Sequence, residues 1–182
     1  MLMKFLDLVK SRQSCRKYSD KAVEREKILR CVEASRLAPS ASNMQPWSFI
    51  IVDDPPMRDK VAGETFNAIV PFNKFALKAP VIAVIVIEGS FSIAQIGGRI
   101  KNKDYRWIDI GIAAEHFCLQ AEEEGLGTCM LGWYNEKNIQ KLLNIPKNKR
   151  IGLLITLGYS ESAQREKTRK SINDILKFNN YE

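Results

Sequence analysis

One apolar run, Val81 to Ile87, constrains the fold more than any other feature of the sequence. No polar residue interrupts it, so it predicts a central β-strand that is buried on both faces. The run is far too short to cross a membrane, because a spanning helix needs about 20 residues. The chain must therefore supply layers of structure that cover both sides of this strand.

Two helical patterns predict such layers. The longer one, Trp107 to Glu124, is apolar around much of its circumference, which is typical of a buried helix. The other, Glu24 to Leu37, carries Ile28, Leu29 and Val32 on one face, which we predict to be buried. In a domain this small, a subunit interface would give the longer helix a second cover.

The remaining elements alternate between helices and strands. Shorter helical patterns occupy Phe5 to Ser11, Met57 to Leu77 with a break near Pro71, and a stretch that begins at the N-cap Asn135 and ends before Pro146. Further strand patterns occupy Trp47 to Val52, Leu126 to Trp133 and Ile151 to Leu157. This order predicts a mixed α/β layer architecture in one domain, residues 1–182.

The composition indicates a globular domain and excludes several classes of protein. A chain of 182 residues, 45% of them hydrophobic, can bury about 70% of its unfolded surface in one core. The cysteines lack metal-ligand spacing, and with one histidine we predict no metal site and no histidine-based catalytic set. The first residues lack a signal-peptide pattern, so we expect a cytoplasmic protein with reduced thiols.

The net charge of +7 raises the question of an anionic partner. Basic residues mostly lie among acidic ones, and the local excesses form three small clusters, at residues 12–17, 99–106 and 167–170. Small clusters suit phosphate-bearing small molecules better than a long polyanion. We therefore predict a small-molecule ligand, with neither nucleic acid nor a membrane as partner.

The segment Ala38 to Trp47 sets small hydroxyl and amide residues between two prolines, which predicts a stiff polar loop. Its small residues let a flat ligand approach the backbone, and the amides of Asn43 and Gln45 both donate and accept hydrogen bonds. The pyrimidine edge of a flavin, with an N–H donor and carbonyl acceptors, is a suitable partner. The alternative is an ordinary turn capped by Asn43.

A short basic segment near the N-terminus alternates Arg12, Ser14 and Arg16. In an extended chain these three side chains point the same way, while Cys15 points the other way. A guanidinium group can bond two phosphate oxygens at once, so the segment suits a phosphate group. A solvated basic turn is the alternative that the residues themselves leave open.

The loop at Ala38 to Trp47 resembles the P-S-x-x-N-x-Q-P-W segment of the FMN-dependent nitroreductase family. Three further elements occur in the order and spacing of that family. They are Arg12 to Tyr18 (R-x-S-x-R-x-F/Y), Gly125 to Trp133 (G-x-G-T followed by G-W), and Leu157 to Tyr159 with the basic Lys167 to Lys170. Each motif is weak alone, but together they cover nearly the whole chain, which is identified as a member of the family.

The resemblance implies the nitroreductase fold, in which a mainly antiparallel sheet is flanked by helices. It also implies an interlocked homodimer. The C-terminal arm, residues 160–182, would wrap the partner subunit and add to its sheet.

The resemblance further implies bound FMN and a set of residues that hold it. The phosphate and ribityl element matches Arg12, Gln13, Ser14 and Arg16. The loop that contacts the other subunit's flavin matches Pro39, Ser40, Ala41 and Asn43, with Gln45 as an accessory contact. Backbone N–H groups that face flavin N5 match Leu131 and Gly132. The C-terminal side of the phosphate site matches Arg169, with Lys167 and Lys170 as alternatives for a second role.

By resemblance, the predicted activity is an FMN-dependent oxidoreductase that takes hydride from NADH or NADPH. Its acceptors would be electron-poor small molecules such as nitroaromatics, quinones or free flavins, and no side chain is predicted to act as a catalytic acid or base. One alternative is a reductive dehalogenase or an oxidative flavin enzyme of the same fold, which the lid segment 88–106 would distinguish. Another is a non-catalytic flavin carrier or redox sensor.

Overall fold

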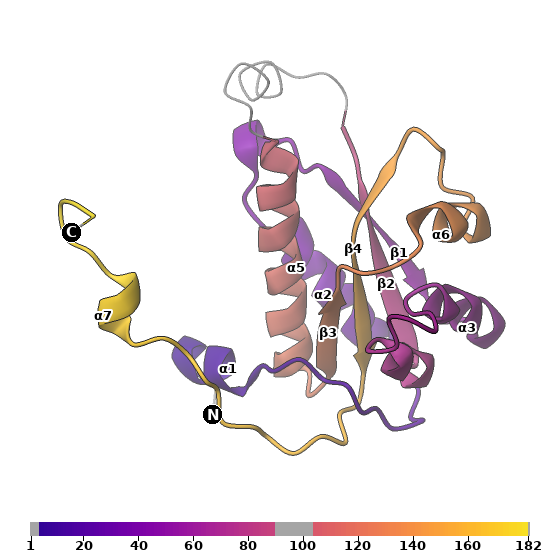
Figure 1. The fold of residues 1–182 in the computed structure, drawn as a ribbon, viewed down its shortest axis with the longest axis horizontal. Helices are drawn as coiled ribbons and strands as arrows, with labels where there is room; N and C mark the ends of the chain where they lie inside the picture. Colours follow the sequence, from indigo (N-terminus) through magenta and orange to yellow (C-terminus); the bar gives the residue numbers. More distant parts are fainter. Residues whose placement is uncertain (1–3, 90–103, 182) are drawn as a thin grey trace.

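The computed structural model describes residues 4–89 and 104–181 (Figure 1). This part of the chain contains a four-stranded sheet, in the spatial order β1 (Trp47–Val52), β2 (Val81–Ile87), β4 (Arg150–Gly158) and β3 (Gly127–Leu131). Every neighbouring pair of strands is antiparallel. The predicted mixed α/β fold with a mainly antiparallel sheet is therefore confirmed. The predicted lid lies largely outside the described residues.

β2 is the interior strand that its apolar run predicts. It pairs with β1 on one side and β4 on the other, and all of its residues are buried. Its side chains alternate between two separate cores, with Ala83 and Ile85 in one and Ile82 and Val84 in the other. The strand is apolar throughout because both of its faces are covered.

Helices provide this cover on both faces of the sheet (Figure 1). One face carries α2 (Arg25–Arg36) and α5 (Tyr105–Glu123), and the other carries α3 (Pro55–Gly63) and α6 (Glu136–Leu142). The shorter elements are α1 (Phe5–Ser11), η1 (Ala41–Asn43), η2 (Lys74–Lys78) and α7 (Ile172–Ile175). Across residues 4–89 and 104–181, no helix combines the length and hydropathy that a bilayer span requires.

Side-chain caps fix where α3, α5, α6 and α7 begin, and two of them bear on the sequence analysis or on the site. Asp104 accepts the backbone N–H of Arg106 at 3.2 Å at the start of α5. Asn135 accepts the backbone N–H of Asn138 at 3.3 Å at the start of α6, so its predicted N-cap role is confirmed.

Two predictions from the helical patterns are wrong in part. The pattern from Met57 to Leu77 is helical only near its ends, in α3 and η2, and residues 64–73 between them are irregular. Leu29 is 59% exposed, whereas its neighbour Ile28 is 4% exposed. Leu29 lies 100° further around α2, beyond the stripe that the rest of the described chain covers.

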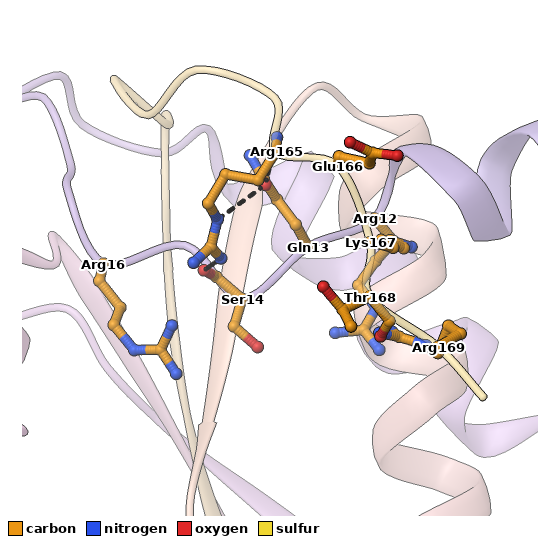
Figure 2. Close-up of a pocket in the computed structure, with 9 residues that line it drawn as sticks. All are labelled: Arg12, Gln13, Ser14, Arg16, Arg165, Glu166, Lys167, Thr168 and Arg169. Carbon is orange, nitrogen blue, oxygen red and sulfur yellow. Dashed lines mark hydrogen bonds between the residues drawn. The ribbon is translucent and has the colours of Figure 1, made fainter.

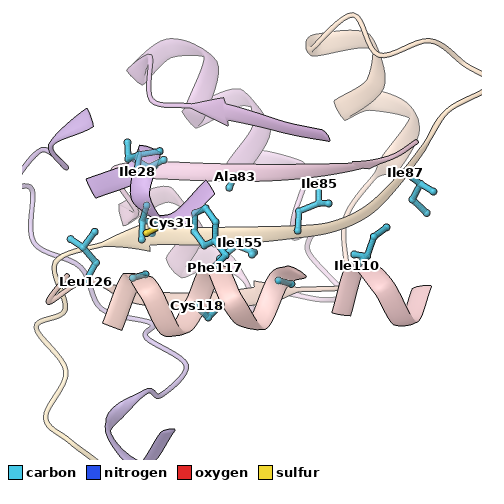
Figure 3. Close-up of a cluster of buried hydrophobic side chains, with 14 residues drawn as sticks. Ile28, Cys31, Ala83, Ile85, Ile87, Ile110, Phe117, Cys118, Leu126 and Ile155 are labelled. Carbon is cyan, nitrogen blue, oxygen red and sulfur yellow. The ribbon is translucent and has the colours of Figure 1, made fainter. Parts of the chain in front are cut away.

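The long helix α5 carries the largest side chain in the core between the helices and the sheet (Figure 3). Phe117 is fully buried and stacks on Phe49 of β1, with the ring centroids 5.9 Å apart and the planes 10° apart. On the other side of α5, Ile108 is 56% exposed in the single chain. That a subunit interface covers this side of α5 stays a prediction.

The buried thiols give the protein a predictable response to alkali. Burial raises the pKa of Cys31 and of Cys118 to about 12, whereas an unfolded thiol ionises near pH 8.5. The unfolded state therefore loses protons first, and the contribution of each thiol to stability is lost as the pH rises from about 9 towards 12.

Urea titrations at pH 7, 9 and 10.5 should show a falling free energy of unfolding. A Cys31→Ala/Cys118→Ala variant should show a shallower fall, and an equal fall in both proteins would contradict this origin.

The chain after β4 leaves the body of the protein. It passes α1 and continues through the short helix α7, well away from the sheet (Figure 1). Apolar side chains of this arm are exposed, among them Ile172, Ile175 and Phe178. An arm with exposed apolar residues and no core of its own agrees with docking on a second copy of the chain, which stays a prediction.

Candidate functional site

The first and last segments of the chain meet beside β3. Ser14 forms a parallel bridge with Thr128, whose carbonyl accepts the backbone N–H of Cys15 at 2.8 Å. The C-terminal segment crosses this N-terminal segment, and a cavity of about 340 Å³ lies between them (Figure 2). We call it the basic pocket, and it is lined by Arg12, Gln13, Ser14, Arg16, Arg165, Glu166, Lys167, Thr168 and Arg169.

The N-terminal segment contributes Arg12, Gln13, Ser14 and Arg16 to the lining of the basic pocket. Cys15 is fully buried on the other side, next to Tyr18, as the alternation of an extended segment predicts. Gln13 departs from that alternation, because it lines the pocket as well. The guanidinium of Arg12 lies 3.4 Å from the carboxylate of Glu115 on α5, which orients it. The role of these residues toward a ligand stays a prediction.

Gln13 fastens the two segments together. Its side-chain amide donates to the carbonyl of Ala163 at 3.0 Å, and its amide oxygen accepts from the backbone N–H of Arg165 at 3.2 Å. The guanidinium of Arg165 in turn donates to the carbonyl of Ser14 at 2.8 Å (Figure 2). These bonds engage the polar atoms of Gln13 in shaping the pocket, and its predicted contact with a ligand stays a prediction.

Arg165 is a cation of the basic pocket that the sequence analysis did not predict. All five residues from Arg165 to Arg169 line the pocket, and three of them are cationic. The available signal was a basic residue two positions before Lys167. Lys170 lies outside the lining, so of the two alternatives the structure brings Lys167 to the pocket.

The basic pocket concentrates positive charge. Its lining has five cationic side chains and one carboxylate, that of Glu166. Partial burial lowers the pKa of Lys167, and the charges of Arg12 and Arg169 lower it further. An anion placed between these groups would relieve their mutual repulsion, and phosphate oxygens match the donors of guanidinium groups. The pocket is therefore suited to a phosphate.

The loop at Pro39 to Gln45 lies elsewhere on the chain. None of its residues lines the basic pocket, and its Ala41 N–H donates to Asp109, near the start of α5. The side-chain amide of Gln45 donates to both oxygens of Asn43, at 3.1 Å each. In one chain the structure does not bring this loop and the pocket into one cavity.

The end of β3 leads away from the basic pocket. Leu131 is buried, and Gly132, which follows it, is exposed. At about 3.3 Å per residue, Gly132 lies roughly 13 Å along the strand from Thr128. A Cβ atom built on Gly132 would meet nothing within 4 Å, so the chain itself leaves this backbone open to a ligand.

Comparison with known proteins gives a consistent picture. A family model described as "Nitroreductase family" matches residues 9–159. An FMN-dependent nitroreductase from Clostridium difficile R20291 has a similar structure, with a TM-score of 0.75 and 28% identity over 97% of this chain and 100% of its own. The oxygen-insensitive NADPH nitroreductase of Helicobacter pylori is 26% identical over 96% of this chain and 99% of its own length. An iodotyrosine deiodinase of Thermotoga neapolitana is 24% identical over 98% of this chain and 100% of its own length.

Proposed function

Because the chain belongs to the nitroreductase family, and is thus an oxidoreductase, we propose that it binds FMN and reduces electron-poor small molecules with NADH or NADPH. The observation that carries this proposal is the basic pocket, where three cationic side chains from residues 165–169 face Arg12 and Arg16 beside β3. Nitroaromatics, quinones and free flavins are the proposed acceptors. The nitroreductases of known name and structure that resemble the chain support this choice.

Different residues of the site suit different parts of FMN. Guanidinium groups of Arg12 and Arg169 suit its phosphate, the hydroxyl of Ser14 suits the ribityl chain, and the open backbone at Gly132 suits the flat ring. When bound, FMN would supply the hydride chemistry, which no side chain of the site needs to perform. The protein would hold and orient the reactants.

A homodimer would complete this site. The loop at Pro39 to Gln45 carries the small residues and amides suited to a flavin, but it does not share a cavity with the basic pocket of its own chain. In a two-fold dimer, each loop can approach the pocket of the partner. The exposed apolar arm after residue 160 supports such a pairing.

The first test is an absorption spectrum of the purified protein supplied with FMN, without oxygen, before and after NADH or NADPH. A bound flavin that bleaches would support the proposed oxidoreductase and identify its donor. A bound flavin that stays oxidised would favour a carrier or sensor. Absence of flavin binding would refute the proposal.

A Gly132→Ala substitution tests the open backbone at the end of β3. The added Cβ has free space around it in the chain, so the thermal unfolding midpoint should stay unchanged. It would intrude on a ring that lies against this backbone, and we expect FMN affinity to fall by about 10-fold or more. Fluorescence titration with FMN measures this. Gly63→Ala is the matched control, because its Cβ also meets nothing and it lies on α3.

Reductive dehalogenation is a second candidate. Two relatives named iodotyrosine deiodinase match the chain, one from Thermotoga neapolitana over 98% of it and one from Haliscomenobacter hydrossis over 81%. A comparison of turnover with halogenated phenols and with quinones decides between the two, since faster reduction of quinones would reject this candidate.

A further inference from the structure

The loop from Ser40 to Gln45 has an unusual backbone. Ser42 and Asn43 have φ angles of 53°, and Gln45 has a φ of 48°. These values lie in the left-handed region, which disfavours residues that have a Cβ atom. Several such residues in one loop persist only where surrounding contacts determine its shape, and such strain clusters at ligand-binding sites.

Hydrogen bonds within the loop set its internal shape. The Ser40 hydroxyl accepts the backbone N–H of Gln45 at 2.9 Å, and its carbonyl accepts the N–H of Asn43 at 3.0 Å. The N–H of Met44 donates to the carbonyl of Ala41 at 3.2 Å. These bonds close the loop on itself, but they do not hold it against the rest of the protein.

A buried carboxylate from α5 supplies that hold. Asp109 is 5% exposed, and its Oδ1 accepts the backbone N–H of Ala41 at 3.1 Å. Burial of a carboxylate is unfavourable unless a hydrogen-bond donor meets it. The buried position of Asp109 on α5 therefore requires a reason. The described chain provides one, because this bond joins the first turn of the strained loop to a rigid element.

We propose that Asp109 is a positioning residue that holds the loop from Ser40 to Gln45 in the conformation that receives a flavin. The inference rests on the proposed function, in which this loop contacts the FMN of the partner subunit. When only a fraction of molecules has the competent loop, the apparent dissociation constant rises by the inverse of that fraction. Asp109 keeps the fraction high before the ligand arrives.

Three variants of the 182-residue chain test this role. Asp109→Leu removes the acceptor at similar size, and Asp109→Asn retains an acceptor oxygen. Ala41→Pro removes the donor from the other side, and proline suits the first position of a helical turn. Asp104→Leu is the matched control, because it weakens the start of α5 through its cap on Arg106 without contacting the loop.

The first measurement is hydrogen exchange of the peptide containing Ala41 to Gln45, without cofactor. We expect faster exchange at the amides of Asn43 and Gln45 in Asp109→Leu and Ala41→Pro, and near wild-type exchange in Asp109→Asn and Asp104→Leu. Equal exchange in Asp109→Leu and wild type would overturn the proposal. If Asp109→Leu fails to fold, the comparison of Ala41→Pro with wild type decides in its place.

The second measurement is fluorescence titration with FMN. Asp109→Leu and Ala41→Pro should each raise the dissociation constant by about 10- to 100-fold, the range for a hydrogen bond to a charged group. Both substitutions remove the same hydrogen bond, between Ala41 and Asp109. The double variant should therefore bind FMN about as weakly as either single variant. Unchanged affinity in Asp109→Leu would overturn the role in binding. If wild type binds no FMN, the proposed function fails, while the exchange result still decides whether Asp109 holds the loop.

Discussion

Replacing Arg12 and Arg169 together by alanine is expected to lower the affinity for FMN by about 10²- to 10⁴-fold. Each side chain would donate charge-assisted hydrogen bonds to the phosphate, and such bonds contribute about 1.5–3 kcal/mol each. The two arginines approach the basic pocket from opposite ends of the chain, so neither can replace the other. Fluorescence titration with FMN measures the loss.

Two controls separate a phosphate contact from general damage. Lys170→Ala removes a positive charge one residue beyond Arg169 but outside the lining of the basic pocket, so FMN affinity should stay within a few-fold of wild type. Riboflavin lacks the phosphate, and its weaker binding should be nearly the same in wild type and the double variant. Tight FMN binding that survives the double substitution would refute the assignment of the site.

Replacing Phe117 by alanine is expected to lower the free energy of unfolding by about 3–5 kcal/mol, the usual effect of removing a buried aromatic ring. The Phe117 side chain is fully buried where α5 packs on the sheet. Its stacking on Phe49 would also be lost, which lowers the stability further. Urea titration followed by circular dichroism measures the change.

Phe72→Ala is the matched control, because the same atoms are removed from a side chain that is 62% exposed. Its effect should stay below about 1 kcal/mol, as for most exposed positions. An effect of Phe117→Ala as small as that of Phe72→Ala would show that the core does not depend on the ring.

The elements best predicted from the sequence are those whose burial is uniform. β2 and α5 are apolar on several sides, so their patterns did not depend on knowing which neighbour covers which face. Leu29 shows the opposite case. The helical pattern of α2 does not show which neighbouring element covers each side chain, and Leu29 is 59% exposed. Residues 64–73 are irregular because the side chain of Asn67 accepts the backbone N–H groups of Ile69 and Val70, at 2.9 and 2.7 Å, and so closes a turn that competes with a helix.

The candidate site could be predicted in parts but not as a whole. Alternation in Arg12, Ser14 and Arg16 selected side chains that share a pocket, since it reflects only local geometry. The hydrogen bonds between Gln13 and Arg165 join residues that are 152 positions apart in the sequence. No local pattern shows which distant backbone group a side-chain amide will meet. Asp109 was likewise hidden, because the sequence does not show which of the acidic residues of α5 is buried or which donor its carboxylate meets.

The meeting of the two chain ends at the basic pocket has a consequence for biosynthesis. The strands of the sheet are complete by Gly158, but three of the five cations of the pocket follow at residues 165–169. On the ribosome, the sheet can therefore form before the basic pocket is complete, and a chain cut short after Tyr159 would keep all strands of the sheet but lack three of the five cations of the pocket. Binding of a phosphorylated ligand in this pocket would then require that translation had passed Arg169.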